Sequence, residues 1–205
     1  MQLTTHYKTQ TASRKILTSI LIIAGVYLLG SSAYMQAKAV LAQWLIASSW
    51  KQALNQESPP PKPWWWADTR AIALLEIPTL NSKLYVMQDA SGESLAFGPG
   101  HMSPSQTPAH NGHVVIAGHR DSHFSILKNI QIGDTIKTTH YDGQQQKTYH
   151  VSSIRIINSD TEKINITDEQ DKLTLITCYP FDGFIPGGPL RLIVESETKK
   201  SHSFN

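Results

Sequence analysis

The sequence contains one cysteine, Cys178, at a position that suits a nucleophile. It ends the run Leu-Thr-Leu-Ile-Thr-Cys, which is typical of a strand, and the Tyr-Pro that follows ends that strand. Side chains at strand ends beside loops are often catalytic, because a rigid scaffold holds them while the loop shapes a pocket. The alternative is a small buried thiol that only fills the core. A reactive thiol would need a basic or cationic neighbour.

Among the nine histidines, His119 is the best candidate for that neighbour. It closes the run His-Val-Val-Ile-Ala-Gly-His, so it also lies where a predicted strand ends. His113 has the same parity on this strand and is a second candidate. We place the following histidines in loops or at strand edges: His110, His123, His140 and His150.

Arg191 is the first cation after Cys178, in the alternating run Leu-Arg-Leu-Ile-Val. The connection Pro180–Pro189 predicts a hairpin-like pair between this strand and the cysteine strand. A guanidinium beside the thiol would supply fixed positive charge and several N–H donors to an oxyanion. Arg120 and Arg155 are rivals, which we place on strands that are not adjacent to the cysteine strand.

The elements that must position these side chains are short β-strands. From residue 70 onward, β-rich runs alternate with turn residues, and one helical stretch interrupts them at His123–Ile130. The expected strands are Ile72–Ile77, Lys83–Met87, Ser94–Phe97, His113–Ala117, Thr135–Thr139, Lys147–Ile157, Leu173–Cys178 and Leu190–Ser196. This pattern predicts an all-β domain, an eight-stranded barrel with one or two short helices.

An uncharged stretch of 22 residues, Ile16–Ala37, precedes this domain. As a helix it would span about 33 Å, which is enough to cross a bilayer core of about 30 Å. The basic residues Lys8, Arg14 and Lys15 precede it, so we expect the N-terminus to stay in the cytoplasm. A cleavable signal peptide is the alternative, although its apolar region is usually only about 7–15 residues long.

The domain organisation follows from these composition changes. Residues 1–15 form the cytoplasmic N-terminus, 16–37 the transmembrane anchor, and 38–63 a juxtamembrane helix with a proline-rich linker. Residues 64–198 form the catalytic domain, and 199–205 a polar tail. Trp64, Trp65 and Trp66 open the domain and lie either at the lipid headgroups or on a packed edge.

Composition excludes several classes of protein. Eighteen basic and 16 acidic residues give a formal net charge of only +2, so nucleic acid is not expected as a partner. A lone cysteine excludes a disulfide-stapled scaffold and a cysteine-rich zinc site.

Together these features resemble a sortase. The resemblance covers residues from about 66 to 196 and rests on the anchor, the eight predicted strands and three motifs. The motifs are Val-Val-Ile-Ala-Gly-His-Arg, Thr-Leu-Ile-Thr-Cys and Arg-Leu-Ile-Val, in that order. Ala-Gly-His-Arg-Asp-Ser-His-Phe and Cys-Tyr-Pro-Phe are most similar to class D-like and Gram-negative sortases, and the tryptophan cluster also suggests the Gram-negative group.

The resemblance implies a membrane-anchored cysteine transpeptidase with Cys178 as nucleophile and with His119 and Arg191 as its partners. Such an enzyme cleaves a C-terminal LPXTG-like sorting signal, holds the protein as a thioester and passes it to an amine acceptor. No cofactor or metal is implied, and the enzyme would lie in the inner membrane with its domain on the periplasmic, extracytoplasmic side. We expect Ala117, Thr177 and Tyr179 to contact substrate.

The resemblance also places one wall of the substrate-binding groove in the connection Asn158–Lys172. This connection contains five acids, which suit either a calcium site or a solvated loop: Asp160, Glu162, Asp168, Glu169 and Asp171. Rival functions stay open: an exported cysteine peptidase that only hydrolyses, and a non-catalytic envelope interaction domain. A zinc site built from His119, His123 and Cys178 is a third.

Overall fold

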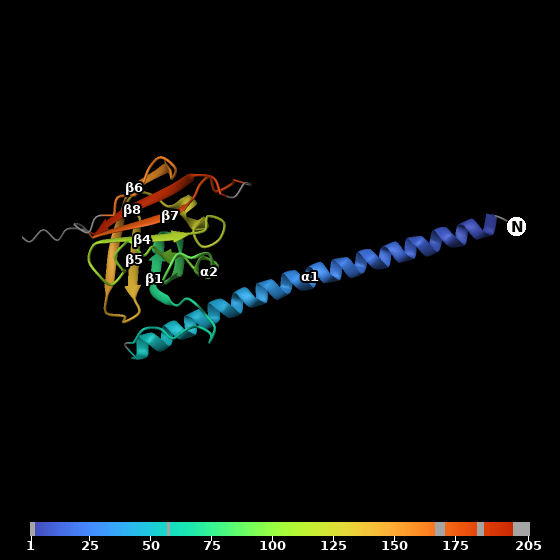
Figure 1. Ribbon diagram of the computed structural model, residues 1–205, viewed down its shortest axis with the longest axis horizontal. Helices are drawn as coiled ribbons and strands as arrows, with labels where there is room; N and C mark the ends of the chain where they lie inside the picture. Colours follow the sequence, from blue (N-terminus) through green and yellow to red (C-terminus); the bar gives the residue numbers. More distant parts are fainter. Residues whose placement is uncertain (1–2, 57, 167–170, 184–186, 199–205) are drawn as a thin grey trace, which may run out of the picture. The chain divides into compact units, whose positions relative to one another are not determined.

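The structure is a computed structural model that describes residues 3–56, 58–166, 171–183 and 187–198 (Figure 1). The chain divides into two compact units, Met1–Ala42 and Gln43–Asn205. The predicted tail at 199–205 lies outside the described residues.

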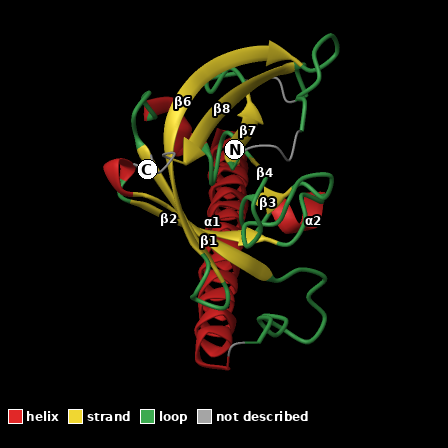
Figure 2. Ribbon diagram, turned by 90° about the vertical axis from the view of Figure 1, so that its left-hand side faces the viewer, coloured by secondary structure: helices red, strands yellow, loops and turns green. Residues whose placement is uncertain are grey.

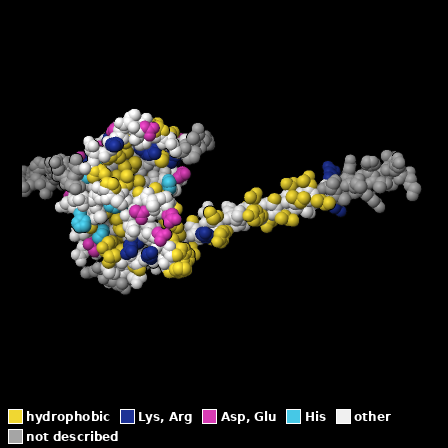
Figure 3. Space-filling model, in the orientation of Figure 1, with side chains coloured by type: hydrophobic (Ala, Val, Ile, Leu, Met, Phe, Trp, Pro, Cys, Tyr) yellow, Lys and Arg dark blue, Asp and Glu magenta, His cyan; other side chains and the backbone are white. Residues whose placement is uncertain are grey.

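The first unit is the N-terminal part of one continuous helix, α1, which spans Leu3–Gln56. Large apolar side chains along it are exposed, from Ile16 at 61% to Leu29 at 74% (Figure 3). Among the described residues, this is the one helix long and apolar enough to cross a membrane, judged by length and composition alone. A helix whose whole surface is apolar suits a lipid environment.

The second unit contains a closed barrel of eight strands, which confirms the predicted fold class (Figures 1 and 2). The strands are β1 Ala71–Ile77, β2 Ser82–Met87, β3 Gly100–His101, β4 His113–Gly118, β5 Thr135–His140, β6 Gln146–Asn158, β7 Lys172–Cys178 and β8 Leu190–Thr198. Around the barrel they follow the order β1-β2-β3-β4-β7-β8-β6-β5. The short helices are η1 Pro78–Leu80, α2 Gly92–Leu95 and η2 Ser125–Asn129.

The barrel core contains alternate side chains of each strand. Leu173 and Leu175 of β7 and Leu192 and Val194 of β8 are all buried in one cluster. Because successive side chains of a strand point to opposite faces, the residues between them point out of the barrel. On β7 these outward residues include Cys178.

Two local predictions differ from the structure. The strand expected at Ser94–Phe97 is wrong, because the chain forms α2 there. The hydroxyl of Ser91 caps α2 by accepting a hydrogen bond from the amide of Ser94 at 3.3 Å, so a helical turn satisfies these backbone groups locally. The helix expected at His123–Ile130 is present only as the shorter 3-10 helix η2.

The C-terminal end of α1 belongs to the second unit and packs on the barrel. Ile46, Trp50 and Ala53 repeat at helical spacing, and all three are buried. The ring of Trp50 lies 5.8 Å from that of Tyr85, and the side-chain amide of Gln43 donates a hydrogen bond to a loop carbonyl at 2.7 Å. This part of α1 is therefore a packed element of the domain.

The three consecutive tryptophans differ in their surroundings. Trp64 makes an edge contact with Phe97 at a centroid distance of 5.0 Å and is partly buried. Trp65 and Trp66 contact each other and are 86% and 61% exposed. A packed edge therefore describes Trp64 but not the other two.

We predict that Trp50→Ala lowers the free energy of unfolding of the domain by roughly 3–5 kcal/mol, because a buried indole leaves a cavity. Urea unfolding of the full chain in detergent, followed by near-ultraviolet circular dichroism, measures the change. Trp44→Ala is the matched control, because Trp44 is 62% exposed on the same helix, and its effect should stay within about 0.5 kcal/mol. Equal effects for the two variants would contradict the packing of α1 on the barrel.

Candidate active site

The backbone register brings the three predicted site residues to one end of three adjacent strands. β4 and β7 are parallel, and Gly118 pairs with Thr177. One residue further along each chain lie His119 and Cys178. β7 and β8 are antiparallel, and Cys178 pairs directly with Arg191. Figures 1 and 2 show β4, β7 and β8 side by side.

The same register puts Cys178 and Arg191 on the outward face of the barrel, and His119 directly follows the last residue of β4. The neighbouring cross-strand pair, Thr177 and Leu192, is buried and points inward. Cys178 and Arg191 are half-buried, and His119 is exposed. The thiol, which is not in a disulfide, is therefore accessible on the face that it shares with a cation.

Contacts beneath this face hold the ends of β4 and β7 together. The hydroxyl of Thr177 donates a hydrogen bond to the carbonyl of Gly118 at 2.8 Å inside the barrel. The ring of Phe124 packs against Gly118, where an added Cβ would lie 2.6 Å from a ring carbon. The amide of Phe124 also donates to the carbonyl of His119 at 3.0 Å. Glycine at position 118 is therefore required for the ring to pack at this end of β4.

The three residues expected to contact substrate lie in different surroundings. Ala117 is half-buried and pairs with Ile176 on the outward face. The ring of Tyr179 packs against the core cluster and contacts Phe181 at 6.3 Å, and its amide donates to the carbonyl of Leu190 at 3.0 Å. Thr177 points inward, as described above. Contact of these residues with substrate stays a prediction.

The guanidinium of Arg191 lies along the connection between β7 and β8. Its Nη1 donates hydrogen bonds to the carbonyls of Gly188 at 2.5 Å and Leu190 at 2.9 Å. These contacts hold the side chain at the end of β8, next to the strand that carries the thiol.

Arg120 lies nearer to the site than the sequence indicated. Arg120 is not on a strand, but it directly follows His119 just beyond the end of β4, which pairs with β7. Its Nη1 donates to the carbonyl of Pro180 at 2.8 Å, and its Nη2 donates to that of Gly183 at 2.6 Å. Arg120 therefore joins the segment after the histidine to the segment after the cysteine. The acceptors are backbone carbonyls, which have no signature in the sequence.

A second histidine, His123, lies close to His119. Burial lowers the pKa of His123 because it disfavours the charged imidazolium, and repulsion from the charge of His119 lowers it further. Within the part of the chain that is described, no three or more His, Cys, Asp or Glu side chains are grouped so that they could hold a metal ion.

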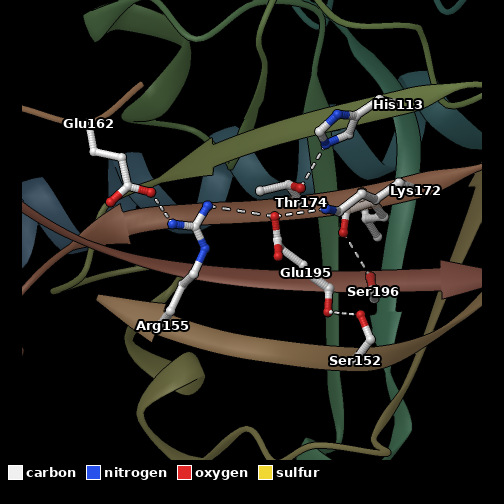
Figure 4. A network of polar contacts seen from close by, with 9 residues as sticks. His113, Ser152, Arg155, Glu162, Lys172, Thr174, Glu195 and Ser196 are labelled. Carbon is white, nitrogen blue, oxygen red and sulfur yellow. Dashed lines mark hydrogen bonds and ion pairs between the residues drawn. The ribbon is translucent and has the colours of Figure 1, made fainter. Parts of the chain in front are cut away.

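A polar network lies on the outward face at the other end of β7 (Figure 4). Glu195 of β8 accepts from Lys172 at 2.8 Å and lies 3.8 Å from Arg155, which also pairs with Glu162. Lys172 and Glu162 both belong to the expected groove wall, so the network fixes parts of that segment on the barrel.

Of the five acids in this segment, Glu162 and Asp171 form ion pairs. Asp171 accepts from Lys147 at 3.2 Å and from the amide of Gly112 at 2.7 Å. Asp168 and Glu169 lie outside the described residues.

Comparison with known proteins gives a consistent result. A family model described as a sortase domain matches residues 75–199. Sortase D of Bacillus subtilis is 32% identical over 126 residues, which cover 61% of this chain and 62% of that protein, less than two thirds of its length. Sortase C1 of Streptococcus agalactiae has a similar structure, with a TM-score of 0.55, 27% identity and coverage of 62% of this chain and 67% of that one. Sortase D5 of Clostridium perfringens, at 24% identity, shares the fold with a TM-score of 0.55 and covers 74% of this chain and 88% of that one.

We predict that Arg120→Gln makes the amides of Tyr179, Phe181, Asp182 and Gly183 exchange hydrogen at least about ten times faster. The reason is that it removes two hydrogen bonds from a charged donor, each contributing about 1.5–3 kcal/mol, and about 1.4 kcal/mol corresponds to a factor of ten. Hydrogen exchange with mass spectrometry of the full chain in detergent measures this rate.

Two further variants test the role of Arg120. Arg120→Lys should restore the slow exchange only in part, because an ammonium lacks the fork that reaches two carbonyls. Lys128→Gln, at an exposed position of η2, should leave exchange in residues 179–183 unchanged. Unchanged exchange in Arg120→Gln would show that this arginine does not hold the segment.

Proposed function

This chain belongs to the sortase family, and from that premise we propose that it is a membrane-anchored cysteine transpeptidase. The observation that supports this most strongly is the alignment of His119, Cys178 and Arg191 on three adjacent strands. A thiol flanked by a base and a fixed cation is the set of groups that acyl transfer through a thioester requires.

In the first half of the proposed reaction, the thiolate of Cys178 attacks the scissile carbonyl carbon, and a C–S bond forms. The carbonyl oxygen becomes an oxyanion, which Arg191 and nearby backbone N–H groups stabilise. Cross-strand partners have Cβ atoms about 4.5–5.5 Å apart, so the guanidinium of Arg191 is within reach of an oxyanion formed on Cys178. The C–N bond then breaks, and His119 protonates the leaving amine.

In the second half, the attacking group is the amine acceptor. His119 takes a proton from the incoming amine, which attacks the thioester carbon. The C–S bond breaks, Cys178 leaves as thiolate, and a new amide joins the substrate protein to the acceptor. The charge state of the site is thereby restored for the next cycle.

We propose an exported protein with a C-terminal LPXTG-like sorting signal as substrate. Ala117 precedes His119 by two residues and Tyr179 directly follows Cys178, and both would contact the residues next to the scissile bond. Thr177 would support this part of the site from inside the barrel, through its hydrogen bond to the carbonyl of Gly118. The segment 158–172, held by the polar network on the outward face, would form one wall of the groove.

Helix α1 would anchor the enzyme in the inner membrane, with residues 1–15 in the cytoplasm and residues 16–37 in the bilayer. This is supported by its exposed apolar surface and by the basic residues at its start. The catalytic domain, 64–198, would then lie on the periplasmic, extracytoplasmic side. Within the predicted juxtamembrane segment 38–63, the last turns of α1 would pack on this domain.

We predict that Cys178→Ala abolishes thioester formation and leaves the fold intact, because Cys178 is half-buried at a strand end and loses only its sulfur. Intact mass spectrometry after incubation with an LPXTG-like peptide detects the acyl-enzyme, and circular dichroism monitors the fold. Cleavage by the alanine variant would refute the nucleophile assignment. In the unaltered chain, added amine should yield a ligated product. Hydrolysis alone would instead identify a peptidase.

We predict that Arg191→Ala lowers turnover by roughly two to three powers of ten, the usual effect of losing one oxyanion donor, and weakens peptide binding less. Arg191→Lys should recover only part of the activity, because it keeps the charge but not the fork of donors. Turnover and melting temperature are measured on the same samples.

Lys83→Ala is the control, since Lys83 of β2 is in an ion pair with Glu76 and β2 does not border β7 or β8. It should lower the melting temperature only slightly and leave turnover per folded molecule near normal. If Arg191→Ala behaved in the same way, Arg191 would be a structural residue rather than a catalytic one.

A further inference from the structure

Three of the five tryptophans have exposed side chains on the second unit. Trp44, Trp65 and Trp66 are 62%, 86% and 61% exposed, and the last two contact each other at a centroid distance of 4.9 Å. We call these three residues the tryptophan surface. Large exposed aromatic groups mark contact sites, because leaving an indole in water forfeits much favourable burial.

Contacts within the unit place the tryptophan surface where the unit begins. The side chain of Gln43, the first residue of the unit, donates to the carbonyl of Phe97 at 2.7 Å. The ring of Phe97 packs on Trp64 at 5.0 Å, and Trp65 follows in the chain. Trp44 is next to Gln43 on α1. Gln43, Phe97 and Trp64 therefore connect both Trp44 and the Trp65–Trp66 pair to the segment where the chain enters the domain.

The chain allows little distance between this point and the membrane. Only six residues lead from Ala37, the end of the uncharged stretch, to Gln43. Six residues reach at most roughly 20 Å when fully extended, and about 9 Å as a helix. The proposed anchor therefore keeps the tryptophan surface close to the lipid headgroups. This step rests on the anchor described under the proposed function.

We propose that Trp44, Trp65 and Trp66 dock the catalytic domain on the headgroup layer of the bilayer that holds α1. Indole rings favour this layer because their apolar body and polar N–H match its two sides. Lys62 precedes the tryptophans by two residues and is exposed, so it adds attraction to anionic lipids.

Docking through this surface would orient the active site. Met87, in the cluster with Trp64 and Phe97, pairs with Gly100, and Gly100 pairs with Ala117 near the end of β4. The tryptophan surface and the end of β4 that carries His119 therefore lie at the same end of the barrel. A docked domain would hold the thiol close to the membrane surface, where a membrane-bound substrate chain emerges.

The test uses the tryptophans as their own probes, because the uncharged stretch 16–37 contains none. The full chain is reconstituted in phosphatidylethanolamine and phosphatidylglycerol vesicles that contain a lipid brominated on the acyl carbons near the headgroup. Bromine quenches indole emission on contact. We expect strong quenching and a blue-shifted emission for the unaltered chain. Most of the quenching should be lost in the triple variant Trp44→Phe, Trp65→Phe, Trp66→Phe.

The control and the second readout separate docking from anchoring. Trp50→Phe, at a buried position, should keep the quenching of the unaltered chain. Extraction with alkaline carbonate tests the anchor in the same vesicles. A chain that resists extraction but shows no quenching overturns the docking and leaves the anchor standing. A chain that carbonate releases overturns both. Quenching that persists in the triple variant would also overturn the assignment of docking to these residues.

Discussion

The register of β7 between β4 and β8 is the constraint on which the active site depends. It pairs Gly118 with Thr177 on one side and Cys178 with Arg191 on the other. Because side chains alternate along a strand, a shift of one residue would turn the thiol into the barrel and expose its buried neighbours. Closure of the barrel and burial of Leu175 and Val194 between the strands make such a shift costly. The hydrophobic core thus fixes where the polar groups lie.

The end of the barrel that carries the thiol is reinforced by contacts with no part in the proposed chemistry. Thr177 and Phe124 secure the end of β4 from within, and Arg120 joins the two segments that leave the site. At the other end of the same face, Glu195 forms ion pairs with Arg155 and Lys172. Rigid support around an accessible thiol is what positioned catalysis requires, since misplacement of reacting groups by about 1 Å can reduce the rate 100-fold.

The domain also contains a second apolar cluster, separate from the barrel core. The last turns of α1 and Trp64 pack with Met87 in an apolar cluster. Within the second unit, the end of α1 is therefore part of the folded domain.

The sequence alone determined the barrel, the apolar helix and the position of the thiol at a strand end. The alternation in β7 and β8 and the uncharged stretch are local patterns. They predict structure because each depends on which residues of one segment are buried, and not on distant partners. The proximity of Cys178 and Arg191 could also be expected, because a short connection joins their strands. Tertiary structure alone decided the rest. The partners of Arg120 are carbonyls about 60 residues away, and carbonyls are common to all residues. Where the sequence predicts a strand at Ser94–Phe97, the hydroxyl of Ser91 caps the helix α2 instead. Trp64, Trp65 and Trp66 are chemically identical, and packing against Phe97 and the neighbouring apolar cluster distinguishes the partly buried Trp64 from the exposed pair.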